Sequence, residues 1–275
     1  MSKNPYESPW RKLAIAVYGA PNEGKVYGTY EIDVSKMLDY IEKKKEQGTR
    51  ITVTNFVTAA LARSLYEDAP EMNCFVQRGK LVPREDANVC VSIARKGKKG
   101  MTGLVIPKTH EMSVSEIAEY QQSRLEKKRK GKEKGTFGAK KIIAKIPWPF
   151  RRPVFKFVKW WAFEMGFKIP FVKIGRDPFG SIMLTNIGTF GLDTGMVALF
   201  PIGKLPGVIA MGKIKEKPVA VDGKVEIRPM LPLTGTFDHR IVDGGKIGDL
   251  ANGIIDRLQE PEKLDQPNIA SPNQK

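Results

Sequence analysis

One short run near the C-terminal end of the chain constrains the fold more than any other stretch. Residues 237–245 place His239 directly after an apolar, strand-like stretch and set an Asp-Gly pair, Asp243 and Gly244, shortly behind it. This order predicts a strand that ends in a tight turn and is followed by a helix. His239 and His110 are the only histidines, so few side chains can act as a base near neutral pH. His239 is therefore a candidate catalytic base, and the alternative is a histidine that only caps a turn.

Composition describes an ordinary globular protein with one unusual region. The chain has 275 residues, 41% of them hydrophobic and 28% charged, which is enough to bury a core. Its two cysteines suit a reducing compartment and no signal peptide is visible, so we expect a cytoplasmic protein. Cysteines and histidines without ligand spacing predict no metal site. The net charge of +16 is concentrated in residues 121–160, where 14 Lys and Arg face two acids.

Apolar patterning predicts alternating strands and helices. Strands are expected at 26–34, 88–94, 103–107, 181–185, 207–214 and 230–237. Helices are expected at 35–46, from Thr54 as N-cap, after a capping box at Ser113 and Glu116, and after Gly245. Two hairpins are expected, one around residues 77–80 and one at Asp222-Gly223. This alternation favours an α/β fold.

The pattern His-x-x-x-Asp-Gly at 239–244, taken with its flanks, resembles the active-site signature of the 2-oxoacid dehydrogenase acyltransferase catalytic domain. That family also includes chloramphenicol acetyltransferase. Further stretches at 70–73, 88–107 and 184–191 are similar to family motifs and occur in the same order. The resemblance covers residues 9–264, interrupted by an insert at about 131–178, and we expect residues 265–275 to be a disordered polar tail.

The resemblance implies a two-layer α/β sandwich of the chloramphenicol acetyltransferase-like type, a mixed sheet with helices on one side. It also implies a homotrimer with active sites at subunit interfaces, where one subunit gives His239 and its neighbour gives the hydroxyl of Thr185. Most relatives have serine at that position, and threonine adds a methyl group and a stiffer χ1. The alternative is that Thr185 is only a β-branched strand residue. The polar C-terminal end predicts a trimer and no larger assembly.

These residues support a coenzyme A-dependent acyl transfer. Neutral His239 can take the proton of a thiol, on coenzyme A or on a dihydrolipoyl group, and the thiolate then attacks an acyl thioester. Thr185 is expected to stabilise the oxyanion, a contribution of about 3 kcal/mol per donor. By resemblance, Asp243 orients the turn through an ion pair, for which Arg11 is one candidate partner.

Three other residues near these motifs are assigned lesser roles. Asp238 and Arg240 are expected to be structural rather than catalytic. His110 is expected to be a solvated surface residue in a polar loop.

The 275 residues contain no lipoyl lysine, so a lipoyl-domain protein acting in trans is one possible partner, and an acceptor other than lipoamide is the alternative.

The basic, aromatic insert leaves three roles open. Val154, Phe157, Val158, Trp161 and Met165 are predicted to share one helical face. The favoured role is a lid over the acyl channel or packing on the trimer. Peripheral membrane contact through residues 140–172 is the second, and nucleic-acid binding, without a recognised motif, the third. The competing function for the whole chain is a catalytically idle trimer that binds lipid or acts as a scaffold through this insert.

Overall fold

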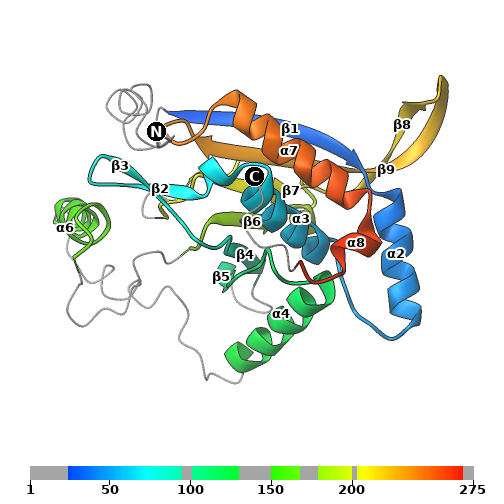
Figure 1. The fold of residues 1–275 in the computed structure, drawn as a ribbon, viewed down its shortest axis with the longest axis horizontal. Helices are drawn as coiled ribbons and strands as arrows, with labels where there is room; N and C mark the ends of the chain where they lie inside the picture. Colours follow the sequence, from blue (N-terminus) through cyan, green and yellow to red (C-terminus); the bar gives the residue numbers. More distant parts are fainter. Residues whose placement is uncertain (1–23, 95–100, 130–149, 168–178, 200–202, 269–275) are drawn as a thin grey trace, which may run out of the picture.

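The computed structural model describes residues 24–94, 101–129, 150–167, 179–199 and 203–268 (Figure 1). Its centre is one sheet in the order β1-β9-β7-β6-β4-β5, and β8 pairs with β9 outside that path. Those strands are β1 (Lys25–Asp33), β4 (Val89–Ala94), β5 (Met101–Ile106), β6 (Ile182–Asn186), β7 (Gly207–Met211), β8 (Lys215–Val221) and β9 (Lys224–Asp238). A separate hairpin consists of β2 (Cys74–Gln77) and β3 (Lys80–Pro83).

The sheet is mixed, as predicted. β4, β6 and β7 run parallel to one another, while β1, β5, β8 and β9 pair antiparallel with their neighbours. The α-helices are α2 (Ser35–Glu46), α3 (Val53–Glu67), α4 (Val114–Arg129), α6 (Arg151–Val158), α7 (Gly244–Leu258) and α8 (Pro261–Leu264). Figure 1 shows α3 and α7 in front of the sheet. Apolar side chains of both helices join Leu184, Met211 and Leu231 of the sheet in one buried cluster, which confirms the α/β layers.

The helix α3 begins two residues earlier than predicted. Thr52, not Thr54, is the N-cap: its hydroxyl accepts from the backbone N–H of Asn55, and the Asn55 side chain accepts from the N–H of Thr52. The usual capping box has Glu or Gln three residues after the N-cap, and here Asn55 takes that place. The sequence pattern therefore does not reveal this cap. Thr54 instead accepts a hydrogen bond from the side chain of Asn186, at the end of β6. The start of α3 is thereby fixed to the Thr185 strand.

The predicted pairing of 207–214 with 230–237 is confirmed, because β7 pairs antiparallel with β9, but the predicted direct hairpin between the two was wrong. β7 ends at Met211, and the strand that turns back at Asp222-Gly223 is the separate β8. Both turn residues have positive φ, as a two-residue hairpin requires. Directly after β7, Gly212 passes against the backbone of Asp193, where a side chain would collide. The distal part of this hairpin extends away from the body of the molecule (Figure 1).

The predicted disordered tail begins too early. The carboxylate of Asp265 accepts hydrogen bonds from Tyr40 and Ser115 and forms a 3.0 Å ion pair with Lys44. Those groups come from α2 and α4, so the first residues after α8 join two helices that precede them by well over a hundred residues. Residues 269–275 lie outside the described part of the chain.

Candidate active site

His239 lies at the point where β9 gives way to the turn before α7. The strand is held on both edges, by β1 and β7, up to its last residues. The backbone N–H of His239 then donates to the carbonyl of Gly24 at 2.8 Å. The imidazole is partly buried, with 27% of its side chain exposed. The predicted strand, turn and helix are therefore confirmed, and they present the ring at the surface of a rigid frame.

The turn itself determines which ring nitrogen of His239 carries the proton. Nδ1 lies 2.6 Å from the backbone oxygen of Val242. A carbonyl oxygen can only accept, so Nδ1 donates, and in the neutral ring the lone pair is on Nε2. Asp243 Oδ1 lies 3.8 Å from the same Nδ1. The hydrogen bond at Nδ1 orients the ring and leaves Nε2 available to act as a general base.

Asp238 and Arg240 form the framework of the turn, in line with the structural role predicted for them. Arg240 clasps the buried Asp238 carboxylate through Nε and Nη2, with Nη2 to Oδ2 at 2.6 Å. The backbone N–H groups of Ile241 and Val242 donate to the Asp238 carbonyl. Burial lowers the pKa of Arg240, but the carboxylates of Asp238 and Glu164 more than offset it. The Asp238–Arg240 pair and these backbone hydrogen bonds close the turn in addition to the bond from the imidazole. Arg11, the predicted partner of Asp243, lies outside the described residues.

Thr185 is on β6, between Ser92 of β4 and Ala210 of β7, and is only 5% exposed. The turn after it is held by Asn186, whose side-chain oxygen accepts from the N–H of Thr189. Gly188 is needed there because a side chain would meet the backbone of Gly212 at 2.6 Å. The hydroxyl of Thr185 thus belongs to a tightly constrained strand end.

Within one subunit, Thr185 and His239 are far apart. The strand register places Thr185 beside Ala210, and Ala210 beside Thr234 of β9. His239 follows Thr234 by five residues, which is about 17 Å along a strand, and β9 lies two strand spacings of about 4.8 Å from β6. The two predicted site residues therefore do not meet in a single chain.

His110 is not a surface residue, and that prediction was wrong. It is 4% exposed, its ring stacks on Tyr66 of α3 at 3.9 Å, and its Nδ1 accepts from the backbone N–H of Ala87. Its sequence neighbours are polar, but the loop folds under α3. Burial lowers the pKa of His110, although Glu111 acts in the opposite direction.

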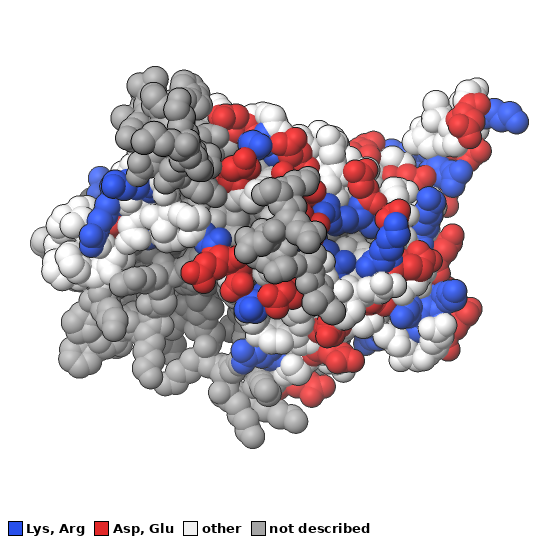
Figure 2. Space-filling view, in the orientation of Figure 1, with Lys and Arg blue, Asp and Glu red and all other residues white. Residues whose placement is uncertain are grey.

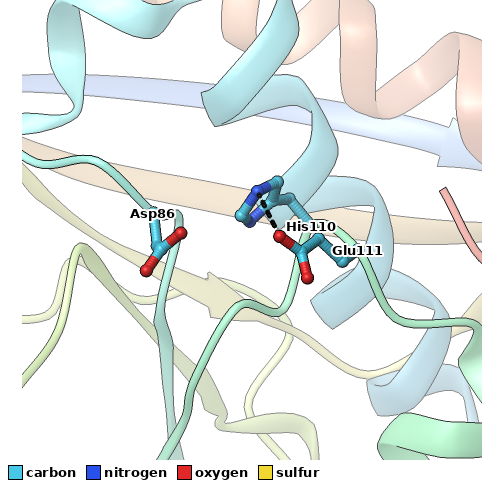
Figure 3. Close-up of side chains that lie close together, drawn as sticks. All are labelled: Asp86, His110 and Glu111. Carbon is cyan, nitrogen blue, oxygen red and sulfur yellow. Dashed lines mark ion pairs between the residues drawn. The ribbon is translucent and has the colours of Figure 1, made fainter. Parts of the chain in front are cut away.

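The one group of potential metal ligands in the described part of the chain is Asp86, His110 and Glu111, whose ligand atoms lie within 4.8 Å of one another (Figure 3). Because His110 Nδ1 accepts a hydrogen bond, Nε2 carries the proton of the neutral ring and faces Glu111 at 3.8 Å. A nitrogen that carries a proton cannot bind a metal. Lys108 also pairs with both carboxylates. The proximity of these three residues is therefore explained by the burial of His110 beside the ion pairs of Lys108 with Asp86 and Glu111.

Comparison with known proteins agrees with this fold. A solved chloramphenicol acetyltransferase covers 92% of this chain and 97% of its own, at 15% identity and a TM-score of 0.51. A probable dihydrolipoamide acetyltransferase from Listeria monocytogenes is similar over 90% of this chain and 87% of its own, at 21% identity and a TM-score of 0.63. The predicted chloramphenicol acetyltransferase-like fold is confirmed.

The family follows from the sequence match. The model of the 2-oxoacid dehydrogenases acyltransferase (catalytic domain) matches residues 20–136 and 179–265, more than half of the chain, which therefore belongs to this family. One relative is the dihydrolipoyllysine-residue succinyltransferase component of the 2-oxoglutarate dehydrogenase complex of Bartonella vinsonii subsp. berkhoffii, 24% identical over 92% of this chain and 52% of its own length. The chain spans about half the length of such relatives. The gap in the family match lies within the predicted insert.

The sequence predicts His239, Thr185 and Asp243 as site residues, but it does not predict the groups that position them. The carbonyl of Val242 is a backbone group, so its hydrogen bond to His239 cannot be predicted from a side-chain motif. The bond from Asn186 to Thr54 joins residues 132 positions apart. Only the turn chemistry of Asn186 before Gly188 was a usable local signal.

Proposed function

We propose that this chain is an acyltransferase catalytic domain that moves an acyl group between coenzyme A and a thiol acceptor, with His239 as the general base. The observation that carries the proposal is the hydrogen bond from Nδ1 to the Val242 carbonyl, which leaves Nε2 as the basic nitrogen. Membership of the acyltransferase family supports the reaction class. The acceptor we favour is a dihydrolipoyl group supplied in trans by a lipoyl domain, because the curated relatives are named for that residue.

The proposed transfer has two steps, addition of the acceptor thiolate and loss of the original thiolate. Nε2 of His239 takes the proton of the acceptor thiol, and the thiolate forms a bond to the carbonyl carbon of the acyl thioester. The carbonyl electrons move onto oxygen, where the Thr185 hydroxyl donates a hydrogen bond. The oxyanion then collapses, the original carbon–sulfur bond breaks, and the departing thiolate regains the proton from the imidazolium. Asp243 and the Val242 carbonyl stabilise that imidazolium on its other side.

We further propose that each active site combines two subunits of a homotrimer in the cytoplasm. The support is geometric: in one chain, the His239 turn and Thr185 are separated by several strand residues and two strand spacings. A site that needs both groups is complete only if a neighbouring copy brings its Thr185 to this His239. A closed assembly lets each subunit give one group and receive the other, and three subunits is the number that the family resemblance implies.

Subunit mixing tests this proposal. Thr185→Ala alone should lower turnover about a hundredfold through loss of one oxyanion donor, and His239→Ala should lower it further. Co-expression of the two variants in equal amounts should restore activity to about a quarter of wild type, since one interface in about four then pairs an intact histidine with an intact threonine.

The controls separate the possible failures. Turnover is measured with acetyl-CoA or succinyl-CoA and dihydrolipoamide, and co-expressed wild type and His239→Ala provide the reference for dilution. If the co-expressed variants show only the average of their separate activities, the site lies within one chain. If wild type transfers no acyl group from any acyl-CoA tested, the idle scaffold is the better account.

A further inference from the structure

The segment 150–167 carries a concentration of exposed aromatic side chains. α6 is followed by one π-helical stretch, Lys159–Glu164, and this change of winding replaces the single α-helical face that the sequence predicted. Six apolar side chains of the segment are each 38–63% exposed: Phe150, Val154, Phe157, Trp160, Trp161 and Phe167. An apolar patch of this kind on a soluble protein marks an interaction site.

The rings pack on one another rather than on the core. Trp161 contacts Phe167 with ring centres 4.7 Å apart and Phe157 at 6.1 Å, and Trp160 lies 6.4 Å from Trp161. Among the described residues, none of these rings belongs to either buried apolar cluster. The aromatic cluster is therefore a separate surface feature, already assembled and turned outward.

The segment is fastened at one end. Arg78, in the turn between β2 and β3, donates to the carbonyl of Met165 through Nη2 at 2.7 Å and through Nε at 3.2 Å. Glu164 lies within electrostatic range of Arg240, beside His239. Figure 1 shows α6 at the side of the molecule, away from the layer of α3 and α7. The aromatic cluster is thus held at a fixed place on the body and leaves its rings accessible.

The charge of the segment complements an anionic surface. Residues 150–167 contain four basic residues and one acid, Glu164, which already faces Arg240. Lys156 is exposed on α6. Figure 2 shows a mainly uncharged surface at the position of α6, with Lys and Arg side chains beside it. Aromatic rings next to basic side chains suit the boundary between acyl chains and anionic headgroups, where each basic residue contributes about 1 kcal/mol.

We propose that residues 150–167 dock on the surface of a membrane that contains anionic phospholipid. The rings of Phe157, Trp160 and Trp161 enter the headgroup region while the basic side chains contact phosphate. A helix of this length lies in the plane of the interface and does not span it. In keeping with this, the part of the chain that the structure describes contains no helix with the length and hydropathy of a membrane span.

The test uses the full chain and vesicles of phosphatidylcholine with or without phosphatidylglycerol, in flotation at physiological salt. Wild type should float with the anionic vesicles only. The double variant Trp160→Ser/Trp161→Ser should bind at least about tenfold more weakly, because it removes the largest apolar surface of the patch. The matched control is Val225→Ser/Ile227→Ser, which removes two exposed apolar residues from the β8–β9 hairpin and should bind like wild type.

Further variants and measurements distinguish membrane docking from the other roles of this segment. Lys156→Glu should weaken binding, and added salt should weaken wild type in the same way. The tryptophan variant should keep its acyl transfer to a short-chain substrate in solution and its oligomeric mass. The proposal is overturned if wild type fails to float, if it binds uncharged vesicles equally well, or if the tryptophan variant floats like wild type. Loss of activity in the tryptophan variant would identify the segment as a lid. A fall in the oligomeric mass of that variant would identify a subunit contact. Binding of wild type to RNA in preference to vesicles would identify a nucleic-acid surface.

Discussion

The chain has two histidines, and their environments differ in almost every respect. His239 is partly exposed at the end of a strand, and its Nδ1 donates to a carbonyl three residues away. His110 is buried under α3, and its Nδ1 accepts from a backbone N–H. The two rings therefore have opposite tautomers, with Nε2 basic in His239 and protonated in His110. The same side chain thus serves as a candidate base in one place and as a core residue in the other.

The largest expected difference between the two is in catalysis. His239→Ala should lower acyl transfer by about 10²–10⁴-fold, the usual contribution of general-base catalysis, because no other side chain of the turn can accept the proton. The folded state should persist, since the turn is closed by Asp238, Arg240 and backbone hydrogen bonds. Steady-state kinetics and circular dichroism of the purified variant provide the measurement. A variant with wild-type turnover would assign the base elsewhere.

The converse is expected for His110, whose loss should affect stability more than chemistry. His110→Ala removes the stacking on Tyr66 and leaves the N–H of Ala87 buried without its acceptor, at a cost of about 2–3 kcal/mol in the free energy of unfolding. Urea denaturation compares it with Lys108→Ala, an exposed neighbour whose loss should lower the free energy of unfolding much less. Activity of the folded His110 variant should remain near wild type. Equal effects of the two substitutions would mean that His110 is not a packed core residue.

The smallest effect is a dependence of stability on pH that arises from His110. Burial lowers the pKa of His110 below 6.5, so the unfolded ring takes up a proton at a higher pH than the folded ring. Its contribution is complete above pH 6.5 and is lost as pH falls through the folded pKa. The free energy of unfolding of His110→Phe should therefore decline less than that of wild type in this range. Urea titrations at successive pH values measure the difference, and identical slopes would contradict the assignment.

Much of the fold and of the candidate site follows from local sequence, because local hydrogen bonds involve only a few consecutive residues. The turn at His239, the two-residue turn at Asp222-Gly223 and the capping box of Ser113 and Glu116 are all formed as predicted. Each depends on φ preferences or side-chain donors within five positions. The order of strands and helices followed from apolar periodicity for the same reason.

Burial and separation were decided only by the tertiary structure, because they depend on which distant element packs against a residue. The polar neighbours of His110 predicted solvent, but Tyr66 covers the ring. The insert was expected to place its apolar residues on one helical face, yet a π-helical stretch turns Trp160 and Trp161 outward together. His239 and Thr185 were both identified from sequence. That they lie at opposite ends of the sheet follows from strand direction and register, which no local pattern encodes.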